Sequence, residues 1–159
     1  MSAHSPPDAA RVKDILGMVF DGVSVKPGAK LDTSPKGSSY FGVYVLDEGT
    51  PAALCGCDIA FAAHTGSALS MLPAGTAREA IKAKSLTPVM LANLHEVMNI
   101  CTRLILRDES PHLRLRQVAA ATALPPDAAA LLSSAKRRVD LEVDIAKYGP
   151  GLLCVLCAG

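Results

Sequence analysis

The pentapeptide "HEVMN", residues 95–99, places side chains that could do chemistry at helical spacing. His95 and Glu96 begin the zinc-protease pattern His-Glu-x-x-His, in which two histidines at i and i+4 bind the metal and the glutamate acts as the base. Asn99 stands where the second histidine is required, and no nearby His, Asp or Glu replaces that ligand at helical spacing. The sequence therefore disfavours a metal site here.

Two interpretations of Glu96 and Asn99 remain. Side chains at i and i+3 of a helix are neighbours, with about 5–6 Å between their Cβ atoms. Polar pairs at this spacing occur on most surface helices, so one interpretation is a solvated face without function. The other is a site whose chemistry needs only these two side chains. The residue pattern alone does not choose between them.

A strongly patterned helix is expected to carry this pair. Thr87 is a good N-cap, and Pro88 suits the first helical position. Apolar residues recur at helical spacing and predict a broad buried stripe: Met90, Leu91, Leu94, Val97, Met98, Cys101, Leu104 and Ile105. The residues expected to point away from that stripe are Ala92, Asn93, Glu96, Asn99, Thr102, Arg103 and Arg107. The two polar groups are thus predicted to face outward together.

Alternating helices and strands precede this helix. Asp8 can cap a first helix that runs to about Phe20. A short strand, "VSVKPG", and a loop rich in Pro, Gly and Ser, "AKLDTSPKGSS", follow it. The strand-like segments "YFGVYVL" and "AALCGCDIA" are joined by the hairpin signal "DEGTP". A helix over about 60–72 should stop before Pro73, and Thr76 can cap a third helix.

The C-terminal part continues the alternation. "HLRLRQV" alternates like a half-exposed strand, and Pro126 and Asp127 open a short alanine-rich helix. "RVDLEVDIAKYG" also alternates, and after the turn "YGPG" the nearly all-apolar Leu152–Leu156 predicts a buried strand. The expected fold is an α/β (α+β) sandwich, with a largely antiparallel sheet and helices packed on one face, in one domain over residues 1–159.

Composition limits the classes of partner. With 159 residues, half of them hydrophobic, the chain can bury a real core, although only 4% are aromatic. A formal net charge of +1 provides no electrostatic basis for holding nucleic acid or an anionic membrane. No signal peptide or membrane-spanning apolar run is evident, so we expect a cytoplasmic protein.

The five cysteines are expected to be buried, reduced thiols. Four of them form the short pairs Cys55/Cys57 and Cys154/Cys157, and Cys101 lies in the patterned helix. A metal or redox site made from the two pairs is the alternative, but neither pair has the His, Asp or turn residues of a zinc knuckle around it. Apolar neighbours and a reducing compartment favour burial.

The order of these segments resembles the CheC/CheX/FliY family of chemotaxis phosphatases, CheX in particular. The likeness extends over nearly the whole chain, from "SVKPG" through the hairpin and "LHEVMNI" to "AKYGPGLLCVL". The family carries a Glu-x-x-Asn motif on a long exposed helix, which matches Glu96 and Asn99. Two departures stand beside this match: Ala92 occupies a position that is often Ser or Asp, with Asn93 adjacent, and the downstream proline, Pro125 or Pro126, lies at a longer spacing.

The resemblance implies hydrolysis of the aspartyl phosphate on a CheY-like response-regulator receiver domain. The receiver would supply Mg²⁺ and a lysine, and the phosphatase would need no cofactor of its own. Asn99 would orient the attacking water, and Glu96 would pair with the receiver's lysine. Arg103 is expected to be a solvated arginine or a docking charge, and His95 a helix-flank residue.

Two further expectations come from the resemblance. CheX-like proteins form homodimers through their sheets, and "LLCVLC" with "VDLEVDI" would supply strand edges for such a contact. The alternative function is a non-catalytic signalling module that docks a receiver domain, or another protein, through the same helix.

Overall fold

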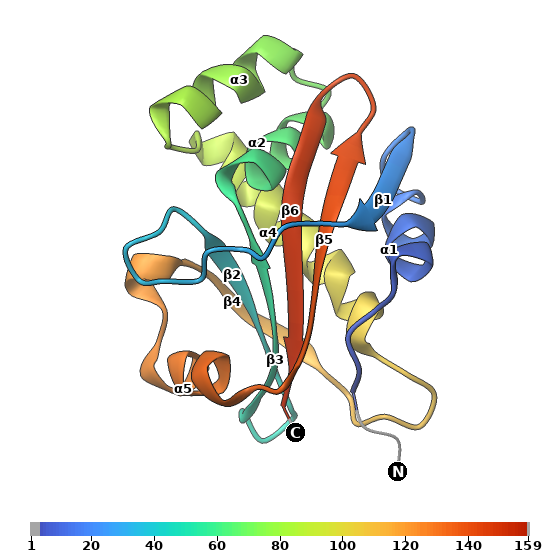
Figure 1. The fold of residues 1–159 in the computed structure, drawn as a ribbon, viewed down its shortest axis with the longest axis vertical. Helices are drawn as coiled ribbons and strands as arrows, with labels where there is room; N and C mark the ends of the chain where they lie inside the picture. Colours follow the sequence, from blue (N-terminus) through green and yellow to red (C-terminus); the bar gives the residue numbers. More distant parts are fainter. Residues whose placement is uncertain (1–3, 159) are drawn as a thin grey trace.

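A six-stranded antiparallel sheet forms the centre of the part of the chain that the computed structural model describes, residues 4–158 (Figure 1). The strands are β1 Val23–Pro27, β2 Tyr40–Val45, β3 Pro51–Cys57, β4 Arg114–Ala120, β5 Arg137–Ile145 and β6 Gly149–Cys157. Their order across the sheet is β1-β5-β6-β3-β2-β4, and every neighbouring pair is antiparallel. The predicted antiparallel α+β fold is confirmed.

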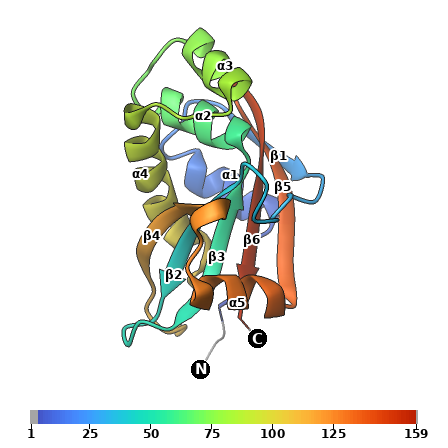
Figure 2. The ribbon, with the colours of Figure 1, turned by 90° about the vertical axis from the view of Figure 1, so that its left-hand side faces the viewer.

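Helices α1, α2 and α4 cover one face of this sheet, and α5 covers the other (Figures 1 and 2). The helices are α1 Ala9–Leu16, α2 Ile59–Ala68, α3 Ala74–Ala83, α4 Pro88–Ile105 and α5 Pro126–Ser134, with a 3₁₀ turn at Ala121–Ala123. Alternate residues of β3 and β6 enter two separate cores, because successive strand residues point to opposite faces. The sequence predicted helices on one face of the sheet, whereas α5 also covers part of the second face.

The second core is small and lies under α5 and the loop before β2. Its buried members are Leu31, Val43, Val45, Leu54, Ala128, Leu131, Cys154 and Leu156. Asp140 ties this loop to β5, because its Oδ2 accepts a 2.8 Å hydrogen bond from the backbone N–H of Leu31. The Pro, Gly and Ser-rich segment is therefore a loop, as predicted, but one that packs over the sheet.

Several helix ends differ from the prediction. Helix α1 has the predicted cap, with Asp8 Oδ1 accepting from the Arg11 N–H at 2.8 Å, but it ends at Leu16 rather than near Phe20. Helix α2 ends at Ala68, four residues short of the predicted end. The predicted cap at Thr76 is wrong: α3 begins at Ala74 after Pro73, so Thr76 lies inside its first turn.

Strands β5 and β6 lie inside the sheet, which corrects one expectation. β5 pairs with β1 and β6, while β6 pairs with β5 and β3. "LLCVLC" therefore supplies no free strand edge, and residues 141–145 of "VDLEVDI" are covered by β1. The outer strands are β1 and β4. Local alternation could not reveal this, because strand order is set by pairings between distant segments.

All five cysteines are buried and none forms a disulfide, as expected. Burial raises the pKa of the Cys154 thiol to about 12 and that of Cys157 to about 11. These groups remain neutral thiols at physiological pH and act as small apolar core residues.

Among residues 4–158, none of the helices combines the length and the apolar character needed to cross a bilayer.

Candidate functional site

Helix α4 begins as its sequence predicts. Thr87 adopts an extended backbone, and its Oγ1 accepts a 3.2 Å hydrogen bond from the Met90 N–H. Pro88 occupies the first helical position, where its missing N–H costs nothing. The side chains that this helix buries are Met90, Leu94, Val97, Met98, Cys101, Thr102, Leu104 and Ile105. The N-cap and most of the predicted apolar stripe are confirmed.

The middle of α4 is held by close contacts and by one buried hydrogen bond. A Cβ atom added at Gly66 of α2 would lie 3.0 Å from the Met90 carbonyl oxygen, and one at Gly42 of β2 would lie 3.3 Å from the Met98 Cβ. The Tyr44 hydroxyl donates a 2.6 Å hydrogen bond to the backbone carbonyl oxygen of Met98. These contacts fix the helix backbone beside Asn99 against the sheet and α2.

Two arginines satisfy the carbonyl groups at the C-terminal end of α4. Arg11 of α1 donates to the carbonyl oxygens of Arg103 at 2.7 Å, Leu106 at 2.9 Å and Leu104 at 3.2 Å. Arg107 also donates to the Leu104 oxygen, at 2.8 Å, and to the Leu106 oxygen, at 3.0 Å. Carbonyl groups at a helix end have no partner within the helix, so these bonds stabilise the last turn and the packing of α1 on it.

Glu96 and Asn99 are both exposed on α4, on the face away from the sheet. Ala92 and Arg103 are exposed on the same stripe, because residues i, i+4, i+7 and i+11 follow one side of a helix. The predicted outward pair is therefore present as an exposed carboxylate and an exposed amide one turn apart. No hydrogen bond to another described residue engages either side chain.

Two residues of α4 depart from the predicted stripe. Leu91, expected inside, is 43% exposed in the first turn of the helix. Thr102, expected outside, is 9% exposed, and its Oγ1 has no hydrogen-bond partner among the described residues. Both departures depend on which neighbouring elements cover α4, and helical periodicity alone could not predict those neighbours.

The structure shows where the two departures from the family pattern lie, at Ala92 and at the downstream prolines. The Asn93 amide donates to the Gly66 carbonyl oxygen and to Ser70 Oγ, each at 2.7 Å, so it joins α4 to the end of α2. It is not available to replace a polar side chain at Ala92. Pro125 and Pro126 begin α5 on the opposite face of the sheet from α4. Neither proline is therefore part of the Glu96 and Asn99 surface.

The histidines do not form a metal centre with this pair. His95 is exposed on α4. Within residues 4–158, His, Cys, Asp and Glu side chains do not gather in groups of three or more that could hold a metal ion. His64 of α2 is buried against Gly149, and this burial lowers the pKa of its imidazole. It contributes to packing under the β5–β6 turn.

Sequence reasoning missed the residues that hold the site in place, Tyr44 and Arg11. A signal for Tyr44 was present, because a tyrosine within an apolar strand requires a partner for its hydroxyl group. Arg11 gave no such signal, since an arginine on a short amphipathic helix is ordinarily solvated.

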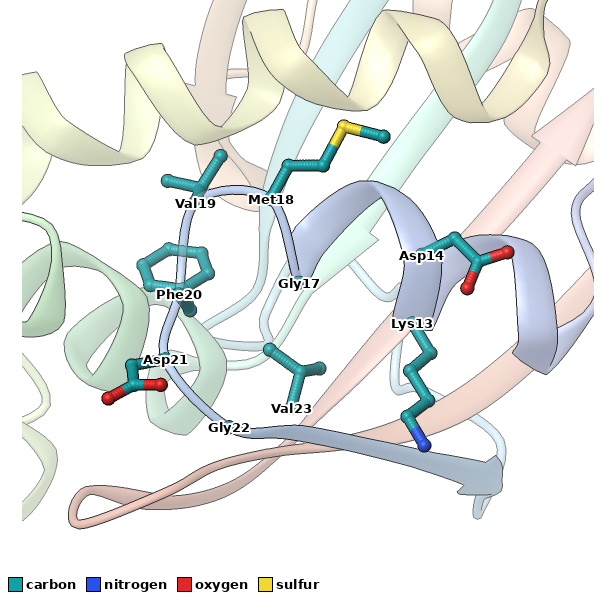
Figure 3. A pocket seen from close by; sticks show the side chains of 9 residues that line it. All are labelled: Lys13, Asp14, Gly17, Met18, Val19, Phe20, Asp21, Gly22 and Val23. Carbon is teal, nitrogen blue, oxygen red and sulfur yellow. The ribbon is translucent and has the colours of Figure 1, made fainter.

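A shallow hollow of about 570 Å³ lies along the segment that joins α1 to β1 (Figure 3). It is lined by Lys13, Asp14 and residues 17–23. Met18 and Val19 are 66% and 37% exposed, and their side chains point toward α4. The exposed face of α4 thus has an apolar border on this side.

Comparisons with known proteins place the fold. No protein-family model matches the sequence, and no curated protein matches it significantly. The structure is similar to that of FliY from Thermotoga maritima, with a TM-score of 0.56 and 12% identity over 95% of this chain and 82% of that chain. It is similar to a chain of the CheX–CheY–BeF3–Mg²⁺ complex from Borrelia burgdorferi, with a TM-score of 0.54 and 12% identity over 94% and 92% of the two chains.

A third similar structure comes from the FliM–SpeE complex of H. pylori. The TM-score is 0.56, with 11% identity over 94% of this chain and 78% of that chain. At such low identity these likenesses concern the fold. The chain has a CheC/CheX/FliY-like fold, as its segment order suggested.

Proposed function

We propose that this protein is a phosphatase that hydrolyses the aspartyl phosphate of a CheY-like receiver domain. The observation that carries the proposal is the exposed pair Glu96 and Asn99, one turn apart on α4. Thr87 caps the N-terminus of this helix, and Arg11 binds carbonyl groups at its C-terminal end. The fold that presents this pair is similar to a chain in a complex with CheY, BeF3 and Mg²⁺. The CheY partner in that complex, the similar fold and the Glu96 and Asn99 motif therefore all support the same reaction.

Asn99 is assigned to the chemistry. Water must attack the phosphorus in line with the aspartyl oxygen, and as the new P–O bond forms the old one breaks, releasing the receiver's carboxylate and inorganic phosphate, with the water's proton passing to the phosphate. The Asn99 carbonyl oxygen can accept a hydrogen bond from this water, while its NH₂ group can donate to a phosphoryl oxygen. The amide thus orients the nucleophile, as a glutamine does in GTPases.

Glu96 is assigned to docking. Its carboxylate is exposed, and it would pair with the lysine of the receiver's phosphorylation site through a charge-assisted hydrogen bond. This contact holds α4 in register, so that Asn99 enters the site. Mg²⁺ bound by the receiver would neutralise phosphoryl charge, and this chain's own residues would supply only positioning.

The second candidate is a docking module without catalytic activity. The observation that favours it is the likeness to a chain of a FliM–SpeE complex, which shows the same fold in a protein–protein complex of another kind. Ala92 also lacks the polar side chain, Ser or Asp, that often accompanies the motif. The neighbouring Asn93 does not replace it, because its amide is bound to Gly66. On this hypothesis the exposed face of α4 binds a receiver or another protein without accelerating dephosphorylation.

A homodimer and a cytoplasmic location remain parts of the proposal. Since β5 and β6 are interior strands, a contact through the sheet would have to involve the outer strands, β1 or β4. Among the strands that the structure describes, β4 pairs with β2 alone, so its other edge has no strand partner within residues 4–158. Light scattering at micromolar concentration tests the dimer: a monomer would remove it from the proposal without affecting the helix site.

Receiver dephosphorylation separates the two functions. CheY-like receivers of the same organism would be phosphorylated with a small phosphodonor, and the loss of phosphate would be followed with and without this protein. We expect catalytic acceleration by the wild-type protein and almost none by Asn99→Ala. Binding to a receiver held by BeF3 and Mg²⁺ without any acceleration would instead select the docking module.

A further inference from the structure

Three arginines gather at the C-terminal end of α4, beside the proposed site. Arg11, Arg103 and Arg107, here called the arginine corner, line a hollow of about 500 Å³ together with Ile15, Leu106 and Asp108. Burial, and the nearby charge of Arg11, lower the pKa of the Arg107 guanidinium. Because the three cations outnumber the one carboxylate in this hollow, it should attract anionic groups.

The three arginines are not equivalent. Arg11 and Arg107 direct several of their N–H groups at the last carbonyls of α4, so they mainly hold the fold. Arg103 is exposed, and the only hydrogen-bonding contact of its side chain among residues 4–158 is a weak one, from Nη1 to the Met18 sulfur at 3.8 Å. No carboxylate pairs with it in the described part of the chain, whereas Arg116 and Arg138 each form an ion pair. Arg103 is thus the member that can bind a partner.

Arg103 lies on the same stripe as the proposed site. It follows Asn99 by four residues and Glu96 by seven, which corresponds to about 10 Å along the helix between the carboxylate and the arginine positions. Its contact with Met18 brings the guanidinium to the α1–β1 segment, where the exposed Met18 and Val19 form the apolar border (Figure 3). The exposed face therefore carries an anion at one end and, at the other, a cation beside apolar side chains.

We propose that the arginine corner and Met18 form a second docking contact, in which Arg103 binds a carboxylate on an acidic, partly apolar patch of the receiver domain. The inference rests on the proposed function for the identity of the partner. Glu96 and Arg103, which have opposite charges and lie on either side of Asn99 along α4, allow a single orientation of the partner. Receivers that lack the acidic residue would bind more weakly. This arrangement gives specificity and a faster encounter more than it gives raw affinity.

Binding of BeF3- and Mg²⁺-loaded receivers tests this contact. For a receiver that the wild-type protein binds, Arg103→Ala should weaken affinity by up to roughly fivefold, the range of an exposed ion pair. Arg103→Glu should weaken it by about tenfold or more, because it sets two like charges together. Both losses should shrink at high salt, where the charges are screened. Met18→Ser should weaken binding to a degree that salt does not change.

Lys36→Glu is the matched control. It makes the same change of two charges at an exposed position in the loop on the opposite face of the sheet, so affinity should stay at the wild-type value. Melting temperatures of all variants would be compared, since Arg103 and Met18 are exposed and their replacement should leave the fold intact.

The outcomes separate this inference from the proposed function. If Arg103→Glu binds as tightly as the wild type, or no more weakly than Lys36→Glu, the second contact is overturned, whatever the phosphatase assay gives. If Arg103→Glu loses affinity while the wild type accelerates no dephosphorylation, the contact stands and the catalytic proposal fails. If the wild type binds none of the organism's CheY-like receivers, both are overturned.

Discussion

The hydroxyl group of Tyr44 lies 2.6 Å from the backbone carbonyl oxygen of Met98 and donates to it across the buried interface between β2 and α4. Met98 immediately precedes Asn99 and faces the core, whereas Asn99 faces solvent. Burial raises the pKa of the Tyr44 phenol well above its usual range, so the hydroxyl keeps its proton and remains a donor. The bond therefore connects the sheet directly to the turn that presents the proposed site.

Replacing Tyr44 by Phe should lower the free energy of unfolding by about 0.5–1.5 kcal/mol, the net worth of one hydrogen bond. Tyr40→Phe, on the same strand, is the control, because no hydrogen bond from the half-buried Tyr40 hydroxyl is present among the described residues. Urea denaturation of the two variants makes the comparison. Equal stability of the two would show that the Tyr44 bond contributes nothing net.

The 28–39 loop should loosen in acid, because it depends on Asp140. Burial by itself would raise the pKa of this carboxyl group, but hydrogen bonds from Arg138, at 2.7 and 2.9 Å, and from the Leu31 N–H outweigh burial and lower it. A lowered folded-state pKa stabilises the fold above the unfolded value of about 3.9, and this contribution is lost as the pH falls through the folded value.

Asp140→Asn should therefore be less stable than the wild type at pH 7, by about 1–3 kcal/mol, because the Arg138 guanidinium loses a charged partner. The difference should shrink once the pH falls below the unfolded value of about 4, and it should be lost only as the pH falls through the lower folded-state pKa of the wild-type carboxyl group. Denaturation curves across this pH range measure both effects. Asp144→Asn, at an exposed position of the same strand, serves as the control, and an equal pH dependence for both variants would contradict the role of Asp140.

The local features of α4 could be predicted, since the cap at Thr87, the proline at the first position and the apolar spacing act within a few residues. The exposed positions of Glu96 and Asn99 follow from the same periodicity. Strand order could not be predicted in this way, because β3 pairs with β6, almost one hundred residues later, and alternation looks the same in an interior strand and an outer one. The apolar run of β6 correctly predicted a buried strand. It could not show that the burial arises from the position of β6 between β5 and β3.

The supporting contacts of the site were beyond local patterns for the same reason. Arg11 reaches carbonyl groups more than 90 residues away, and Asn93 bonds to the end of α2, although helical spacing marked it as an outward polar residue. Each contact depends on how two helices pack. The sequence could therefore nominate the two exposed residues of the motif but not the neighbours that hold them.

Glu96→Gln should weaken the binding of a receiver held by BeF3 and Mg²⁺, because an amide forms a weaker contact with the receiver's lysine than a carboxylate does. The remaining affinity and activity should depend less on salt, since the screened ion pair has been removed. The single-turnover rate at saturating receiver should change far less than the affinity. Glu79→Gln, an exposed carboxylate on α3, is a control for the loss of one negative charge. An unchanged affinity for Glu96→Gln would remove its docking role.

Asn99→Ala should lower the rate of dephosphorylation rather than the affinity for the receiver. An oriented hydrogen-bonding group in a transition state is worth roughly 10²–10³ in rate, taking an oxyanion-hole donor as the scale, so the single-turnover rate at saturating receiver should fall by about this factor. Affinity for the BeF3-loaded receiver should fall much less, and the exposed position implies an unchanged melting temperature.

Asn93→Ala is the matched control on the same helix. Its amide is already bound to Gly66 and Ser70, so this variant should lose stability but keep the single-turnover rate of its folded fraction. If Asn99→Ala and Glu96→Gln lower affinity equally and neither changes the saturated rate, α4 is a docking surface and the non-catalytic hypothesis holds. If neither substitution changes either quantity, the two side chains are only a solvated face of α4, because a group that orients water in the transition state cannot be removed without a loss of rate.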